Sequence, residues 1–257
     1  MARLGSLEPG TPAALEWLWP GTIWRLDTAL NGYESPRGPT LATQAPPGGH
    51  LRLLEPSATP QAADSAAGGR LRVQLLEDGY RCWMDAEDLL GHAVAAQAPR
   101  PRLLDEGQIR DRLPAVLAWA LAASSVPNRY LWGGCLGPDL DCSGLIQAAF
   151  ASAGIRLPRD AYQQERFCQP VAVRPGCHRL LRPGDLIFFG SARRCTHVGL
   201  HLEAGHYLHS SGRVHGRDGL GIDSLSPAST DPVSVHYRSQ LRGAGRVVRC
   251  HDGNTLP

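Results

Sequence analysis

Cys142 is the strongest candidate nucleophile in this 257-residue sequence. It precedes Ser143, Gly144 and an apolar run with helical spacing, so we expect it to open a helix over residues 142–153, capped by Gly154. Free backbone N–H groups and the positive end of the helix dipole would lie near the sulfur and lower its pKa. Gly144 should keep the first turn slim enough for a substrate to approach. Alone, a helix-initial cysteine is more often an inert buried thiol.

A base for this thiol is expected on the strands that follow the helix. In "THVGLHL", His197 and Gly199 share one strand face, and on the next strand, "HYLHSSG", Tyr207 and His209 do the same. If the two strands pair as a hairpin, His209 can hydrogen-bond the far ring nitrogen of His197 and fix its tautomer. Nucleophile, base and orienting group would then form a triad.

Two other uses of cysteine are weaker. Cys135 lies in the "WGGCLGPDL" loop with no helix N-terminus behind it, and we interpret it as a bystander thiol. A metal site would need cysteines about two to four residues apart. No pair has that spacing in the set Cys168, Cys177, His178, Cys195 and His197. We therefore expect no metal and no cofactor.

Three regions are expected along the chain. Residues 1–95 form a small barrel of short strands, residues 96–107 a proline-containing linker, and residues 108–252 a catalytic domain. The 29 glycines and 21 prolines favour such short strands and turns. The insert over residues 56–69 is interpreted as a mobile loop.

Residues 108–252 should form an α+β domain. Apolar residues from position 109 to 120 predict a helix that starts at Gln108, with Pro114 near its start. Strands are then expected at "DLIFFG", "THVGLHLEAG", "HYLHSSG" and "GRVVRC", with the middle ones in hairpin order. Helices followed by an antiparallel sheet define this fold class.

Composition excludes several classes of partner. The formal net charge is +2 and the charged fraction 19%, with scattered arginines, so neither nucleic acid nor an anionic membrane is an expected partner. The first residues contain no apolar run of signal-peptide or membrane-span length, which predicts a cytoplasmic protein. In that compartment the seven cysteines should be free thiols.

Several motifs in order resemble the NlpC-type cysteine peptidases, papain-like hydrolases of peptidoglycan stem peptides. They are "YLWGG", "DCSGLIQAAF", "GIRLPRDAYQQ", "LRPGDLIFF", "THVGLHL" and "YLHSSG". The resemblance implies that Cys142 is the nucleophile, His197 the general base and His209 the third member of the triad. It also implies that Tyr130 lines the site near the oxyanion, and that Asp141 and Ser143 contact the substrate.

The N-terminal region resembles the bacterial SH3-like barrel of two-domain members, especially cyanobacterial ones. In these the barrel closes one end of the groove, which implies a preference for peptides with a free N-terminal L-Ala. The implied reaction is cleavage between γ-D-Glu and the diamino acid, meso-diaminopimelate or L-Lys, during murein peptide recycling. A free ammonium at a closed end needs carboxylates. Asp141 and Glu34 could supply them, and Tyr80 a hydroxyl.

One departure and two alternatives remain. Many members have a serine directly after "PRD", where this chain has Ala161, so we expect altered affinity or specificity with the triad intact. Arg159 could pair locally with Asp160 or reach the substrate. The same scaffold could also serve an amidase or acyltransferase. A non-catalytic binder of wall peptides is a further alternative, against which the intact triad argues.

Overall fold

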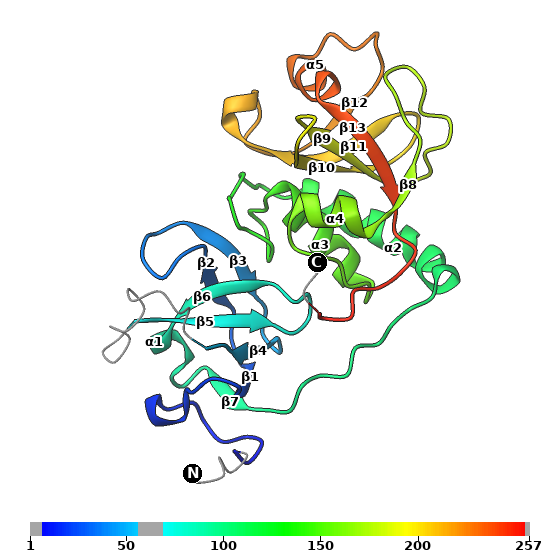
Figure 1. The fold of residues 1–257 in the computed structure, drawn as a ribbon. Helices are drawn as coiled ribbons and strands as arrows, with labels where there is room; N and C mark the ends of the chain where they lie inside the picture. Colours follow the sequence, from blue (N-terminus) through cyan, green and yellow to red (C-terminus); the bar gives the residue numbers. More distant parts are fainter. Residues whose placement is uncertain (1–6, 56–68, 255–257) are drawn as a thin grey trace. The chain divides into compact units, whose positions relative to one another are not determined.

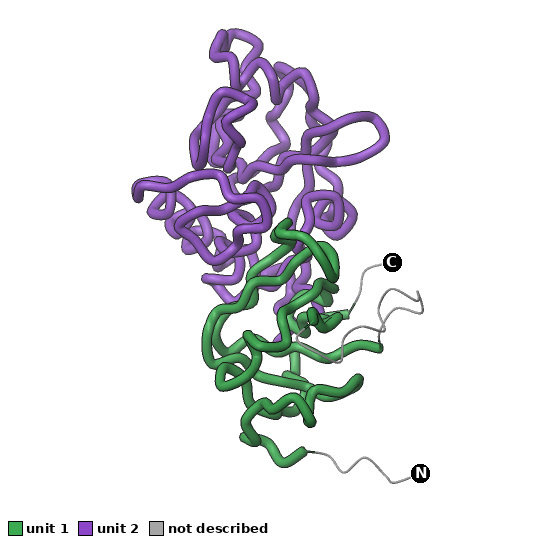
Figure 2. Tube along the Cα trace, turned by 90° about the vertical axis from the view of Figure 1, so that its left-hand side faces the viewer, with its two compact units in different colours: residues 1–101, 253–257 green, residues 102–252 purple. Residues whose placement is uncertain are grey.

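The computed structural model describes residues 7–55 and 69–254, and the chain divides into two compact units. The first comprises Met1–Pro101 with Gly253–Pro257, and the second Arg102–Asp252 (Figure 2). The predicted mobile insert, residues 56–69, lies outside the described residues except for Gly69. Within the described ranges, no helix is long and apolar enough to cross a membrane.

The first unit is a seven-stranded antiparallel sheet with the order β3-β2-β6-β5-β4-β1-β7. Its core contains the fully buried Trp24, Leu51, Val73 and Met84, and the partly buried Leu71 packs against it. Its elements are η1 (Leu15–Trp17), β1 (Ile23–Leu26), β2 (Leu30–Tyr33), β3 (Leu41–Ala45), β4 (His50–Leu53), β5 (Arg70–Leu75), β6 (Arg81–Asp85), α1 (Ala86–Leu89) and β7 (Ala93–Ala95).

The second unit combines helices with a six-stranded antiparallel sheet of order β12-β11-β10-β9-β13-β8, which confirms the α+β class. Helices α3 and α4 pack on β10, and α5 packs on β12 (Figure 1). The elements are α2 (Glu106–Ser124), α3 (Cys142–Ser152), α4 (Ala161–Phe167), β8 (Gln169–Val171), β9 (Leu186–Gly190), β10 (Cys195–His201), β11 (His206–Ser211), η3 (Arg213–His215), β12 (Gly219–Ser224), α5 (Pro232–Ser239) and β13 (Leu241–Arg246).

Helix α2 begins earlier than its apolar pattern predicted. The Asp105 carboxylate accepts from the backbone N–H of Gln108, and the Gln108 side chain accepts in return from the Asp105 N–H. This capping box starts the helix at Glu106, so Pro114 stands in its interior on the exposed side. The predicted inner face is present, with Ile109, Val116 and Ala120 buried.

Helix α3 agrees with its prediction. It begins at Cys142, and Gly154 follows its end with φ of 74°. Its apolar face, Leu145, Ile146, Ala149 and Phe150, is fully buried. The last strand lies four residues earlier than predicted, because β13 starts at Leu241 and pairs with β9 from that residue.

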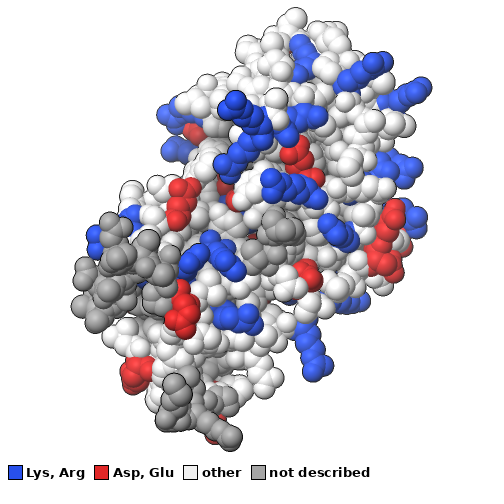
Figure 3. All heavy atoms as spheres, viewed as in Figure 1, with Lys and Arg blue, Asp and Glu red and all other residues white. Residues whose placement is uncertain are grey.

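Charges of both signs are spread over the face of the molecule shown in Figure 3. On the second unit, arginines are separated by uncharged surface on this face. This distribution gives no large single-sign field there.

Candidate active site

Cys142 is held at the N-terminus of α3, with its side chain against β10. Asp141 is the N-cap residue, and its carboxylate accepts a hydrogen bond of 2.6 Å from the backbone N–H of Gly144. The thiol also meets the backbone N–H groups of Val198 and Ser143. Val198 directly follows His197 in β10, so the first turn of α3 meets the sheet beside this histidine.

The predicted lowering of the Cys142 pKa is wrong. Burial raises the thiol pKa to about 12, and the neighbouring Asp141 carboxylate acts in the same direction. Burial also holds the pKa of the His197 imidazole well below its usual range. Burial thus favours the neutral form of both the thiol and the imidazole.

The expected hydrogen bond between the two histidines is present. Strands β10 and β11 pair through Leu200 and Leu208, and Nε2 of His197 lies 2.7 Å from Nδ1 of His209. His209 is completely buried and His197 is 7% exposed. Two buried polar rings need partners of this kind, because an unpaired buried polar group costs about 1–3 kcal/mol.

Asp223 continues this chain and was missed in the sequence. Its Oδ2 lies 2.7 Å from Nε2 of His209 and accepts from Arg217 Nη2, also at 2.7 Å. Its Oδ1 accepts from the Ser234 hydroxyl at 2.7 Å. The carboxylate is 3% exposed, and these donors hold its pKa far below the usual range despite its burial. The sequence feature that pointed to this residue was an acidic side chain between the apolar residues of "GIDSL".

Two tyrosines border the thiol and the imidazole. The Tyr237 ring stacks on His197 with centroids 4.1 Å apart, and its hydroxyl lies 2.8 Å from the Ser211 hydroxyl. Burial raises the pKa of Tyr237 to about 12, and the nearby Cys142 acts in the same direction. Burial and Cys142 likewise raise the pKa of Tyr130, the residue expected near the oxyanion. Both tyrosines are therefore close enough to Cys142 for a charge on its sulfur to affect their pKa values.

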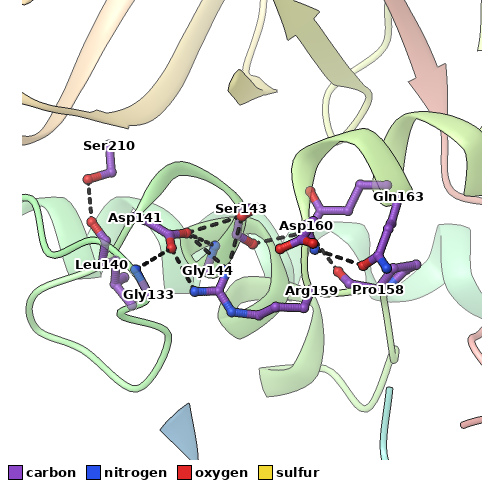
Figure 4. A network of polar contacts seen from close by, with 11 residues as sticks. Gly133, Leu140, Asp141, Ser143, Gly144, Pro158, Arg159, Asp160, Gln163 and Ser210 are labelled. Carbon is purple, nitrogen blue, oxygen red and sulfur yellow. Dashed lines mark hydrogen bonds and ion pairs between the residues drawn. The ribbon is translucent and has the colours of Figure 1, made fainter. Parts of the chain in front are cut away.

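Asp141, Ser143 and Arg159 form one buried network (Figure 4). Arg159 Nη2 and Nη1 donate to the two Asp141 oxygens at 2.6 and 3.1 Å, and Nη1 also donates to the Ser143 hydroxyl at 3.0 Å. The Asp141 carboxylate accepts further from the N–H of Gly133 and from the Ser143 hydroxyl. With five donors already on two oxygens, its first role is to hold the loop and the start of α3.

Arg159 is 1% exposed, and its guanidinium is directed to Asp141 and Ser143 rather than serving only a local pair with Asp160. Gly144 also differs from its expected role. A Cβ at this position would lie 2.0 Å from the Gly134 carbonyl oxygen and 3.1 Å from the Cys135 Cα. The missing side chain therefore admits the preceding loop, not a substrate.

Glu34 and Tyr80 belong to the first unit. Glu34 is exposed at the end of β2, and Tyr80 is half-buried against the core of its own sheet. Their contacts with a substrate ammonium stay predictions. Ala161 is buried as the first residue of α4, where a serine hydroxyl would enter a closely packed position.

The seven cysteines are free thiols, as expected, and Cys135 is buried. Among residues 7–55 and 69–254, no group of three or more His, Cys, Asp or Glu side chains is arranged to hold a metal ion.

Comparison with known families agrees with this geometry. Residues 127–239 match the NlpC/P60 family, and residues 32–89 match the bacterial dipeptidyl-peptidase SH3 domain. The second unit carries an NlpC/P60 domain. The first carries a bacterial SH3 domain. The predicted fold class and the two-domain resemblance are thereby confirmed.

Curated relatives of the NlpC/P60 domain include endopeptidases. The domain is 37% identical over 104 residues to the gamma-D-glutamyl-L-lysine dipeptidyl-peptidase of Bacillus subtilis (strain 168), covering 39% of this chain and 32% of the relative. It is 33% identical over 123 residues to the bifunctional muramidase/DL-endopeptidase CwlT of the same organism, covering 46% of this chain and 32% of the relative. The matched part thus spans about a third of each relative's length.

Among solved structures, an NlpC/P60 family protein from Bacillus cereus ATCC 10987 aligns with a TM-score of 0.43 and 20% identity, covering 89% of this chain and 64% of the other.

The packing at Gly144 predicts that Gly144→Ala destabilises the protein by about 1–3 kcal/mol, because the Cβ would overlap the Gly134 carbonyl. Urea denaturation, followed through the unfolding transition of the second unit, measures the change in the free energy of unfolding. Gly243→Ala is the matched control, because an added Cβ there meets nothing within 4 Å. Equal stability of the two variants would show that the loop does not pack on α3 as described.

The buried ion pair predicts that Arg159→Met destabilises the protein by about 3–5 kcal/mol, because it leaves the Asp141 carboxylate buried without its guanidinium. The control is Arg110→Met, which removes an ion pair whose two side chains are 72% and 73% exposed and should cost less than about 1 kcal/mol. Thermal unfolding of both variants gives the comparison, and similar losses would contradict the buried pairing.

Proposed function

We propose that this protein is a cysteine endopeptidase that cleaves the bond between γ-D-Glu and the diamino acid of peptidoglycan stem peptides. The proposal rests on one arrangement of buried residues. Cys142, at the start of α3, contacts the backbone of β10 next to His197, and His197 is hydrogen-bonded to His209. The NlpC/P60 match and the name of the Bacillus subtilis dipeptidyl-peptidase relative support it.

The chemistry runs in two steps. Nδ1 of His197 takes the thiol proton as the Cys142 sulfur attacks the γ-carbonyl of D-Glu, because Nε2 of the same ring is held by His209. His197 then protonates the leaving amine of the diamino acid, and a γ-glutamyl thioester remains on Cys142. Water, deprotonated by His197, hydrolyses the thioester and restores the thiol. Tyr130 and Tyr237 border this centre and limit its access to water.

The proposed specificity concerns the N-terminal end of the peptide. The family resemblance predicts that Glu34, Tyr80 and Asp141 recognise a free L-Ala ammonium. Asp141 already pairs with Arg159, so its charge is partly engaged before a substrate binds. A substrate with a free N-terminal L-Ala is a wall fragment that other hydrolases have already released. We propose on that ground a cytoplasmic role in murein peptide recycling.

Cys142→Ala should lower the rate of cleavage of L-Ala-γ-D-Glu-diamino acid peptides by at least about 1,000-fold with the fold intact, because no other group can form the thioester. Cys135→Ala, the neighbouring buried thiol, should retain activity and is the control. Product masses measured with and without an added amine acceptor separate hydrolysis from acyl transfer. Full activity of the Cys142 variant would refute the proposal.

Removing the substrate ammonium should reduce kcat/KM by about 10- to 100-fold, the value of a charged hydrogen bond. Two peptides test this: N-acetylated L-Ala-γ-D-Glu-diamino acid, and the analogue in which propionyl replaces L-Ala and adds no bulk. Loss with both indicates recognition of charge. Loss with the acetylated peptide alone indicates a closed end without ammonium recognition, and unchanged rates with both exclude the specificity proposed here.

A further inference from the structure

We propose that Asp223 is a positioning residue that sets the order of protons along His209 and His197, so that Nδ1 of His197 is left bare to receive the thiol proton. The inference rests on the proposed function for its catalytic meaning. The proton order itself follows from the contacts of three buried side chains and can be measured without a substrate.

The contact between Asp223 and His209 determines which nitrogen of His209 carries a hydrogen. The Asp223 carboxylate has donors on both oxygens, from Ser234 and Arg217, and an ionised carboxylate can only accept. The ring nitrogen facing it, Nε2 of His209 at 2.7 Å, must therefore carry a hydrogen.

The position of the hydrogen on His209 determines the position of the hydrogen on His197. A neutral imidazole carries one hydrogen, so with Nε2 protonated, Nδ1 of His209 is bare and can only accept. The nitrogen 2.7 Å away, Nε2 of His197, must then be the donor. By the same count, Nδ1 of His197 has a free lone pair. Burial favours the neutral form of both rings, which the count requires.

The surroundings of Asp223 are built to keep it ionised. Arg217 reaches the carboxylate across β12 at Gly221, where a Cβ would lie 2.2 Å from Arg217 Nη1. Gly221 pairs with His209, and Asp223 pairs with Tyr207, so histidine and carboxylate lie on the same face of neighbouring strands. Burial lowers the pKa of His209 and Arg217 acts in the same direction, while Asp223 acts against them; the net effect favours the neutral ring.

The test is the tautomeric state of the imidazoles in the full-length protein, measured by long-range ¹⁵N–¹H correlation at neutral pH. We expect His197 and His209 both to be protonated on Nε2. In Asp223→Asn, the amide can also donate to His209, so the Nδ1-protonated tautomer of His209 should become populated. The turnover number should fall about 10- to 100-fold, by analogy with the loss of groups that orient metal-bound histidines, with KM within about twofold.

The matched control is Asp185→Asn, because Asp185 is also a buried carboxylate that accepts from an arginine, Arg246, in the same unit. It should leave both tautomers and the turnover number unchanged. A wild-type spectrum with either ring protonated on Nδ1 overturns the inference, as does an Asp223→Asn variant with wild-type tautomers and turnover. If Asp223→Asn does not fold, the wild-type spectrum alone decides. If the protein shows the expected tautomers but cleaves no stem peptide, the proposed function is refuted and the inferred proton order is not.

Discussion

The hydrogen bond between His197 and His209 sits inside the second sheet, where neither ring has enough contact with water to replace it. The rest of the site is arranged around that requirement. The pairing of β10 with β11 brings the rings together, and the pairing of β11 with β12 places Asp223 behind His209. His209 needs a partner on its far nitrogen, which Asp223 provides. The Asp223 carboxylate in turn accepts hydrogen bonds from Arg217 and Ser234. The register of three strands thereby determines that Nε2 of His197 is engaged by His209.

The other side of the site depends on a second buried pair. Asp141 caps α3, binds the preceding loop through Gly133 and pairs with Arg159. These contacts fix the first turn, on which the position of the Cys142 sulfur depends. They also leave the site close to neutral, since the negative charge of Asp141 meets its own arginine. Burial is then the main effect that disfavours a lone thiolate at Cys142, and what remains of the Asp141 charge adds to it.

The sequence predicted those features that depend on residues close together in the chain. Cys142 opens a helix because a capping aspartate and an apolar face follow each other within a few residues. His197 and His209 meet because two adjacent strands form a hairpin. Asp223 could not be predicted in the same way, because "GLGIDS" has two glycines in six residues and resembles a turn, and its role appears only when β12 joins β11. The Arg159–Asp141 pair joins residues 18 positions apart, with helix α3 and the segment after it between them. The Cys142 pKa was predicted from the helix dipole alone, whereas burial is the larger effect.

The central claim is that Cys142 forms a γ-glutamyl thioester, and trapping that species tests it most directly. Rapid acid quenching of the protein with L-Ala-γ-D-Glu-diamino acid peptide, followed by digestion and mass spectrometry, should find an L-Ala-D-Glu acyl group on the peptide that contains Cys142, formed before the free dipeptide accumulates. Turnover without any acyl-enzyme, or an acyl group on another cysteine such as Cys135, would contradict the account.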